Sequence, residues 1–232
     1  MLSKSSGSHQ NLRYVFLLSL LLGALGVSLF LAVSMGSVQI SLSDTYRIIL
    51  SKMGAPLDIG ELSKSTLAIV WNMRLPRVFL GLIVGAGLSM CGSVMQSTVN
   101  NPIAEPYVLG ISAGATFGAT LSIILGFKVM IGLGSFIGAL VATVAVLLIA
   151  SMQGRMTTSS LILSGTVVNA LFLAFSNFII SIGANADSVM TIKFWTMGSL
   201  AGTSWAHLTL PTVVVGIAFC NLSQPNFGLD EV

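Results

Sequence analysis

Several apolar runs in this sequence are long enough to cross a lipid bilayer, and this feature constrains the fold more than any other. The first run extends from residue 14 to residue 35 without a charged side chain. As a helix it would extend about 33 Å, which exceeds the hydrocarbon core of a bilayer, roughly 30 Å. It is also longer than the apolar core of a cleavable signal peptide, about 7–15 residues. We therefore expect a retained membrane span.

Five further apolar runs follow, at residues 78–95, 108–125, 130–152, 161–182 and 208–222. The last is the shortest and begins near Pro211, which a helix tolerates at its start. Only 7% of the residues are charged, whereas a soluble domain carries about a quarter. The sequence predicts an all-α, polytopic membrane protein of about six transmembrane helices, organised as one domain over residues 1–232.

The composition and motifs exclude several other classes. The net charge of +3 is small and the basic residues are scattered, which argues against nucleic acid as a partner. There is no Walker-type G-x-x-x-x-G-K-[ST] motif, so energy from ATP would have to come through another subunit. No residue cluster has metal-ligand spacing, and we interpret the eleven methionines as gap-filling residues. Cys91 and Cys220 lie in apolar runs and are expected to be reduced packing residues.

The longest polar interval, residues 36–77, is expected to lie in water outside the membrane. Within it, residues 43–51 resemble a short amphipathic helix, with Ser43 or Asp44 as the possible N-cap. If the N-terminus is cytoplasmic, the inner side holds three basic residues and the outer side seven. The inner residues are Lys4, Arg13 and Arg155; the outer ones are Arg47, Lys52, Lys64, Arg74, Arg77, Lys128 and Lys193. The positive-inside rule by itself favours the opposite orientation.

Small residues recur every four positions at Gly81 and Gly85, and again at Gly110, Gly114 and Gly118. This spacing lets membrane helices approach closely, so we expect a compact bundle. The same stretch contains a G-x-S-x-G pattern with Ser112 at its centre. A hydrolase nucleophile needs a strand–turn–helix context and a histidine base. Because the flanks are helical in pattern and the chain has only two histidines, we interpret Ser112 as a packing residue.

Two polar passages are typical of a transport pathway. In the run 161–182, Thr166, Asn169, Ser176 and Asn177 fall near one helical face, which must contact other protein or a wet cavity. Helix–helix hydrogen bonding and a hydrophilic pathway both explain this spacing. Between the second and third runs stand Pro102 and Pro106, each of which removes a backbone donor and disfavours helix. Non-helical backbone at a membrane edge must be buried in protein or line water.

Several ordered motifs resemble the permease subunits of ferric-siderophore and vitamin B12 ABC importers. They are RLPR at 74–77, GAGLSMCGSVMQ at 85–96, NPIAEPYVLGISAGA at 101–115, LILSGTVVNALF at 161–172 and FWTMGSLAGTSW at 194–205, the last being a loop pattern after the fifth helix. The resemblance implies an α-helical permease in the cell membrane, with a cytoplasmic N-terminus. It works as a homo- or heterodimer with a second permease, two cytoplasmic ATPase subunits and an extracytoplasmic binding protein. This chain would bind no cofactor and catalyse no reaction; ATP is used by the ATPase subunit.

The resemblance also implies roles for particular residues. Arg74 and Arg77 would dock acidic residues of the binding protein, which would explain the basic outer surface. The other interpretation of these arginines is a helix end anchored at lipid headgroups. The cytoplasmic gate would comprise Asn101, Ile103, Thr158 and Ser159. The resemblance favours pathway lining for Thr166, Asn169, Ser176 and Asn177. The cargo would be an iron–siderophore complex, haem or cobalamin.

One departure from the family pattern is length, because similar permeases have about ten spans and this sequence provides six. Residues 223–232 resemble only the start of the cytoplasmic region that contacts the ATPase, so we expect a truncated chain or fragment. Alternative functions are an ion-coupled secondary transporter and a membrane assembly protein without transport. A secondary transporter usually has ionisable residues within its spans. Here the clearly placed acidic residues lie in loops, which counts against that class.

Overall fold

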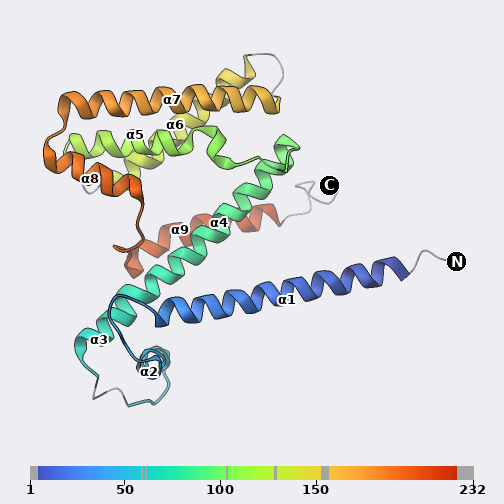
Figure 1. Ribbon diagram of the computed structural model, residues 1–232, viewed down its shortest axis with the longest axis vertical. Coiled ribbons are helices and arrows are strands. Elements are labelled where there is room, and N and C mark those ends of the chain that lie inside the picture. Colours follow the sequence, from blue (N-terminus) through green and yellow to red (C-terminus); the bar gives the residue numbers. More distant parts are fainter. Residues whose placement is uncertain are drawn as a thin grey trace. The chain divides into compact units, whose positions relative to one another are not determined.

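The structure is a computed structural model that describes residues 5–58, 60, 62–102, 104–127, 130–152 and 157–223. Helices account for all the regular secondary structure in these residues (Figure 1). The α-helices are α1 (Ser5–Ser34), α2 (Leu42–Lys52), α3 (Lys64–Ala68), α4 (Leu75–Val99), α5 (Ile111–Ile124), α6 (Ile131–Ser151), α7 (Thr158–Gly183), α8 (Ala186–Met197) and α9 (Trp205–Leu222). A π-helical turn, η1 (Ile69–Arg74), and a 3-10 turn, η2 (Pro106–Leu109), complete the order. The all-helical prediction is confirmed.

Five of the described helical segments are long and apolar enough to span a membrane. They are Leu12–Ser34, Lys64–Val99, Ile131–Ser151, Thr158–Gly183 and Trp205–Leu222. The run predicted at 108–125 forms only the shorter helix α5, which has 14 residues. Such a helix is about 21 Å long and does not cross a bilayer core. The last span begins at Trp205, before the predicted run, so Pro211 lies inside α9 and not at its start.

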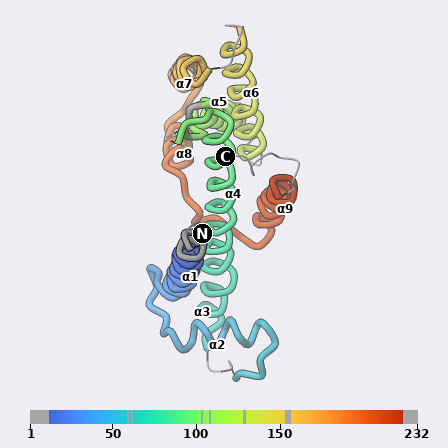
Figure 2. Tube along the Cα trace, turned by 90° about the vertical axis from the view of Figure 1, so that its right-hand side faces the viewer, coloured from blue at the N-terminus to red at the C-terminus, as the bar shows by residue number. Residues whose placement is uncertain are grey.

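The chain divides into two compact units. Unit 1 comprises residues 1–84 and 200–214, and unit 2 comprises residues 85–199 and 215–232. In unit 1, α2 follows α1 after a short connection, as Figure 2 shows. The predicted N-cap of α2 is wrong: Ser41 caps the helix by accepting a hydrogen bond from the backbone N–H of Asp44 at 3.0 Å. A serine oxygen at the N-cap satisfies a backbone donor in the first turn that the helix leaves unpaired.

The end of the predicted polar interval 36–77 is helical. Residues 64–77 are helical, because α3, η1 and α4 form one continuous run from Lys64 to Val99. The helix that carries the second span therefore starts well before residue 78, and Arg74 lies within this helical run, where it is 8% exposed. A capped start explains the early helix: the Ser63 hydroxyl accepts the N–H of Thr66 at 3.1 Å.

In unit 2, α5 packs against α6 and α7, and α8 turns back against α5 (Figure 1). The α5–α6 contact depends on glycine. A Cβ added at Gly114 would clash with Gly138 O, and one added at Gly118 would clash with Gly134 O. The clash is reciprocal at Gly138 and Gly134, so two pairs of glycines let the two backbones touch. Predicted packing is confirmed at Gly114 and Gly118 but not at Gly85, which has no neighbour within 4 Å of an added Cβ.

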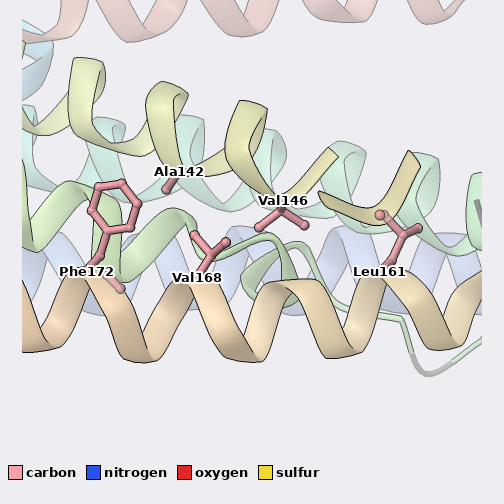
Figure 3. Close-up of a cluster of buried hydrophobic side chains, with 7 residues drawn as sticks. Ala142, Val146, Leu161, Val168 and Phe172 are labelled. Carbon is pink, nitrogen blue, oxygen red and sulfur yellow. The ribbon is translucent and has the colours of Figure 1, made fainter. Parts of the chain in front are cut away.

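A small apolar core fills the space between α5, α6 and α7. In Figure 3, Ala142 and Val146 of α6 face Val168 and Phe172 of α7, with Leu161 further along towards one end. Phe172 also meets Phe117 of α5 edge to face, with ring centroids 5.4 Å apart. The remaining core residues are Ala113 and Ala150. The outer face of α6, by contrast, exposes large apolar side chains, as a lipid-facing helix does. Examples are Phe136, Leu140 and Leu148.

Candidate translocation pathway

Residues 100–110, which connect α4 to α5, form a re-entrant segment beside α7. At its start, the Thr158 hydroxyl at the N-terminus of α7 donates to Val99 O at 3.0 Å. At its end, a Cβ on Gly110 would lie 3.4 Å from Cγ1 of Val168, which stands further along α7. The ten helical positions from Thr158 to Val168 correspond to about 15 Å, so the segment runs back along α7 by that distance. Irregular backbone in a membrane protein must be buried in protein or line water, and α7 covers this segment on one side.

A glycine ends the re-entrant segment, and a capping box begins the helix α7 that lies beside it. Gly110 has a φ of 68° and directly precedes the first turn of α5. This left-handed conformation is one that residues with side chains disfavour. At the start of α7, Thr157 and Ser160 cap each other: the Ser160 N–H donates to the Thr157 hydroxyl at 3.1 Å, and the Thr157 N–H donates to the Ser160 hydroxyl at 3.0 Å. This capping box fixes where α7 begins, and with it the position of Thr158.

Two of the four residues predicted to form the gate line the same cavity in the structure. Asn101 and Thr158 line the same small cavity of about 70 Å³, together with Met95, Val99, Ala104, Leu161 and Ile162. These residues come from α4, the re-entrant segment and the first turns of α7. Ser159 is exposed and does not line this cavity. Ile103 lies outside the described residues.

The polar residues predicted to share one face of α7 differ in their exposure to solvent. Thr166, Asn169 and Asn177 are exposed within the described part of the chain, whereas Ser176 is 2% exposed. The Ser176 hydroxyl donates to Phe172 O of its own helix at 2.8 Å. Ser176 therefore belongs to the packed face of α7. A residue that lines a wet pathway needs access to water, so the lining hypothesis applies to the other three.

A larger groove of about 650 Å³ lies between α5 and α8, and its residues are not among the site residues predicted from the sequence. Its lining includes the hydroxyls of Ser112 and Thr116 on α5 and of Thr191 and Thr196 on α8, with Trp195 beside them. Thr116 donates to Ser112 O, Thr191 to Asp187 O, and Thr196 to Ile192 O. Each threonine uses its hydrogen within its own helix, so its oxygen lone pairs remain available to a donor on a ligand.

The sequence does not predict helix α8, because residues 186–197 have no strong helical period and the loop pattern at 194–205 overlaps the end of the helix. Its N-cap is nevertheless visible in the sequence: Asn185 accepts the N–H of Ser188 at 2.8 Å, and Asp187 stands in the first turn. The four-residue spacing of Ser112 and Thr116 is a second signal, because these residues share one helical face. None of the described residues that line the groove carries a charge.

The docking role predicted for Arg74 conflicts with its position. Its guanidinium donates from Nη1 to Val33 O at 3.1 Å and to Ser34 O at 2.9 Å, and from Nη2 to Val38 O. These contacts satisfy backbone carbonyls at and just beyond the C-terminal end of α1, which have no partner within the helix. A Cβ on Gly36 would lie 2.7 Å from Nη2, so glycine leaves room for the side chain. Arg74 is a buried cap on α1 and not a surface group.

Arg77 has the opposite environment. It is exposed, and its Nη2 donates to Ala201 O at 3.1 Å within unit 1. The cations of Arg47, Lys52 and Lys64 are also exposed in unit 1. Within the described residues, none of these four cations forms a salt bridge. Unit 1 thus presents positive charge that an acidic partner could neutralise.

The structure shows the surroundings of Ser112 and of the histidine His207. Ser112 lies in the first turn of α5 and not on a strand–turn–helix elbow. The Nδ1 atom of His207 is close to Ser204, accepting its backbone N–H at 3.2 Å, so the imidazole lies against the start of α9. No group of three His, Cys, Asp or Glu side chains among the described residues could hold a metal ion. Cys91 and Cys220 are free but exposed, so the chain's own core does not use them for packing.

Comparison with known proteins identifies the relatives of this chain. Residues 15–226 match the model of the FecCD transport family. The cobalamin import system permease of Halobacterium salinarum is 39% identical over 168 residues, covering 71% of this chain and 45% of the relative. The molybdate import system permease of Haemophilus influenzae is 30% identical over 186 residues, covering 78% of this chain and 53% of the relative.

Among solved structures, this chain is similar to a putative metal-chelate type ABC transporter in an inward-facing conformation. The TM-score is 0.67 and the sequence identity is 26%, over 90% of this chain and 61% of that structure. The chain therefore spans about half of the curated relatives and three fifths of the solved one.

Proposed function

The chain belongs to the FecCD transport family, and from this premise we propose that it is a permease subunit of an ATP-driven importer for cobalamin or a metal chelate such as an iron–siderophore complex or haem. It is a multi-pass membrane protein with five helices of spanning length in its described residues. The proposed complex contains a second permease, two cytoplasmic ATPases and an extracytoplasmic binding protein. ATP hydrolysis belongs to the ATPase subunits, and this chain provides part of the translocation pathway.

One observation carries the proposal: Asn101 and Thr158, which are far apart in the sequence, line one small cavity where the re-entrant segment leaves α4. The Thr158 hydroxyl ties α7 to the last carbonyl of α4 across this point. We place the inner gate of the pathway here, with the N-terminus of α1 also on the cytoplasmic side. A net hydrogen bond of about 0.5–1.5 kcal/mol is a suitable strength for a gate, because it holds one state without preventing the other.

Above the gate, the proposed pathway is lined by uncharged polar groups. Thr166, Asn169 and Asn177 supply the exposed face of α7, and the α5–α8 groove supplies hydroxyls and the indole of Trp195. Because these walls carry no charge, they would bind a large, neutral or well-shielded cargo weakly and let it pass. An oxyanion such as molybdate would lose its hydration without gaining a cationic partner from these residues. This difference supports a corrinoid or chelate as cargo.

On the outer side, Arg77 and the other exposed cations of unit 1 form the proposed docking surface for an acidic binding protein. Arg74 is excluded from this surface by its contacts with the end of α1. This docking surface would explain the predicted excess of basic residues outside the membrane, because a docking surface needs charge opposite to that of its partner.

The gate is tested by replacing Thr158 with valine, which keeps the shape and removes the hydrogen bond to Val99 O. In the complete transporter in lipid vesicles, Thr158→Val is expected to raise basal ATPase activity or cargo leak about twofold to tenfold. The matched control is Thr143→Val, because the Thr143 hydroxyl donates only to Ala139 O within α6. If Thr158→Val and Asn101→Ala leave both transport and basal ATPase activity unchanged, the gate assignment is wrong.

The alternative of an ion-coupled transporter makes a different prediction in the same vesicles. Uptake by such a protein would depend on an ion gradient and would continue without ATP. Uptake by the proposed importer requires ATP and the binding protein, and ionophores leave it unchanged. Competition between labelled cobalamin, a ferric siderophore and molybdate would then identify the cargo.

A further inference from the structure

A backbone carbonyl near the start of the second span loses both of its possible helical partners. In the π-helical turn η1, the N–H of Leu75 donates to Val70 O, five residues earlier. Trp71 O would accept from Leu75 in an α-helix or from residue 76 in a continued π-helix. Leu75 is already used, and residue 76 is proline, which has no N–H. The helix itself therefore leaves Trp71 O unsatisfied.

The missing donor comes from a distant part of the sequence within unit 1. The indole Nε1 of Trp205, the first residue of α9, donates to Trp71 O at 2.9 Å. The Trp205 ring also packs against the rings of Trp71 and Phe79, at centroid distances of 5.4 Å and 5.8 Å. One hydrogen bond and two ring contacts thus join two segments that are far apart in the sequence.

A second tie lies further along the same helical run. Arg77 Nη2 donates to Ala201 O, four residues before Trp205. Residues 198–204 connect α8 to α9, and Thr203 within this connector is only 9% exposed. The connector is therefore bound to the start of the second span at both Ala201 and Trp205.

We propose that Trp205 is a positioning residue whose indole N–H replaces the donor that Pro76 lacks and so pins the 198–204 connector to the second span. The connector follows α8, whose residues Thr191 and Thr196 line the groove with α5. The contact at Trp205 holds the unit 1 end of this connector against the second span. The contacts that carry this proposal all lie in unit 1. Their consequence for transport, a restricted movement of the connector, rests on the proposed function.

The pin predicts a specific coupling between Trp205 and Pro76. Trp205→Phe keeps an aromatic ring and removes the N–H donor. Pro76→Ala restores a backbone N–H, so that Trp71 O can be satisfied within the helix, as a π-turn or as a regular α-turn. The indole should therefore matter when residue 76 is proline and become redundant when residue 76 is alanine.

The experiment measures the thiol-labelling rate of Thr203→Cys in the purified full chain, with Cys91 and Cys220 replaced by serine. Trp205→Phe is expected to accelerate labelling about threefold to tenfold, the effect of losing one net hydrogen bond. In the Pro76→Ala background, the same change should accelerate labelling less than about twofold. No acceleration in the proline background, or the same acceleration in both backgrounds, would overturn the proposal. Because labelling needs neither cargo nor ATPase, its result is independent of the transport assay.

If Pro76→Ala does not fold, a second measurement tests whether the Trp205 indole donates to Trp71 O. Infrared spectra of protein with ¹³C-labelled tryptophan carbonyls report the hydrogen bonding of Trp71 O directly. In Trp205→Phe, one of the two remaining labelled bands, Trp71 and Trp195, should move to higher frequency. Unshifted bands would show that the indole does not serve this carbonyl, and the proposal would fail.

Discussion

Replacing Gly118 with alanine should weaken the α5–α6 contact that supports both the groove and the re-entrant segment. The new Cβ would clash with Gly134 O and lie 2.7 Å from the carbonyl carbon of Gly134 and 3.2 Å from Ser135 N. All three atoms belong to the backbone of α6, so no flexible side chain can move aside. The helices must instead separate by several tenths of an ångström or more.

The expected loss follows from the packing around this contact. A gap of about 0.5–1 Å already removes a quarter to a half of the dispersion attraction between facing atoms. Overpacking of this kind typically costs about 1–3 kcal/mol. Alanine also gains up to about 1 kcal/mol in helix propensity over glycine, which partly offsets the clash. The appropriate control is therefore another glycine-to-alanine change inside a helix, so that the propensity gain cancels.

Gly92 of α4 provides this control, because an added Cβ there meets nothing within 4 Å. The free energy of unfolding of the purified chain is measured by titrating detergent micelles with SDS. Gly118→Ala should be less stable than Gly92→Ala by about 1–3 kcal/mol. Equal stability of the two variants would refute the inference that these glycines bring the α5 and α6 backbones into contact.

Three further changes test unit 1. Arg74→Gln should reduce the free energy of unfolding by about 2–3 kcal/mol in the same titration, because it removes charged hydrogen bonds to carbonyls around the end of α1; an unchanged value would restore Arg74 as a docking candidate. Gly36→Ala should reduce it in the same direction by displacing the Arg74 guanidinium, and a neutral result would show that the guanidinium has room to move. Arg77→Gln should leave stability within about 0.5 kcal/mol but weaken binding of an acidic binding protein at low salt, measured by calorimetry. Binding that is equally strong in Arg77→Gln would remove Arg77 from the proposed docking surface.

The membrane-spanning character of the chain could be predicted from the sequence because apolar length is a strong, local signal. The run 161–182 became α7 with boundaries close to those expected, and the same holds for 130–152 and α6. The run 108–125 was too long by comparison with α5, because Gly110 and the 3-10 turn before it shorten the helix. Hydropathy counts apolar residues whether they form a helix or a covered irregular segment, so it overestimates a re-entrant span.

The roles of single polar residues were harder to predict because they depend on contacts between distant segments. RLPR predicts two equivalent arginines, but the structure turns Arg74, at the end of the π-turn, to the end of α1 and leaves Arg77 exposed. Likewise, Ser176 and Asn177 are neighbours in the sequence, and only the packing of α7 on its neighbours separates the buried one from the exposed one. Asn101 and Thr158 were paired through the family resemblance and not through any spacing in the sequence.

The proposed transport function requires the exposed polar face of α7 to line a water-filled pathway. Asn169→Cys and Val167→Cys test this directly, because both positions are exposed but lie on nearly opposite sides of α7. In membranes containing the assembled transporter, a hydrophilic, membrane-impermeant thiol reagent should label Asn169→Cys readily, and added cargo should slow that labelling. Val167→Cys, on the apolar face, should stay unlabelled. Equal labelling of the two positions, or protection by lipid at Asn169, would contradict the proposed pathway.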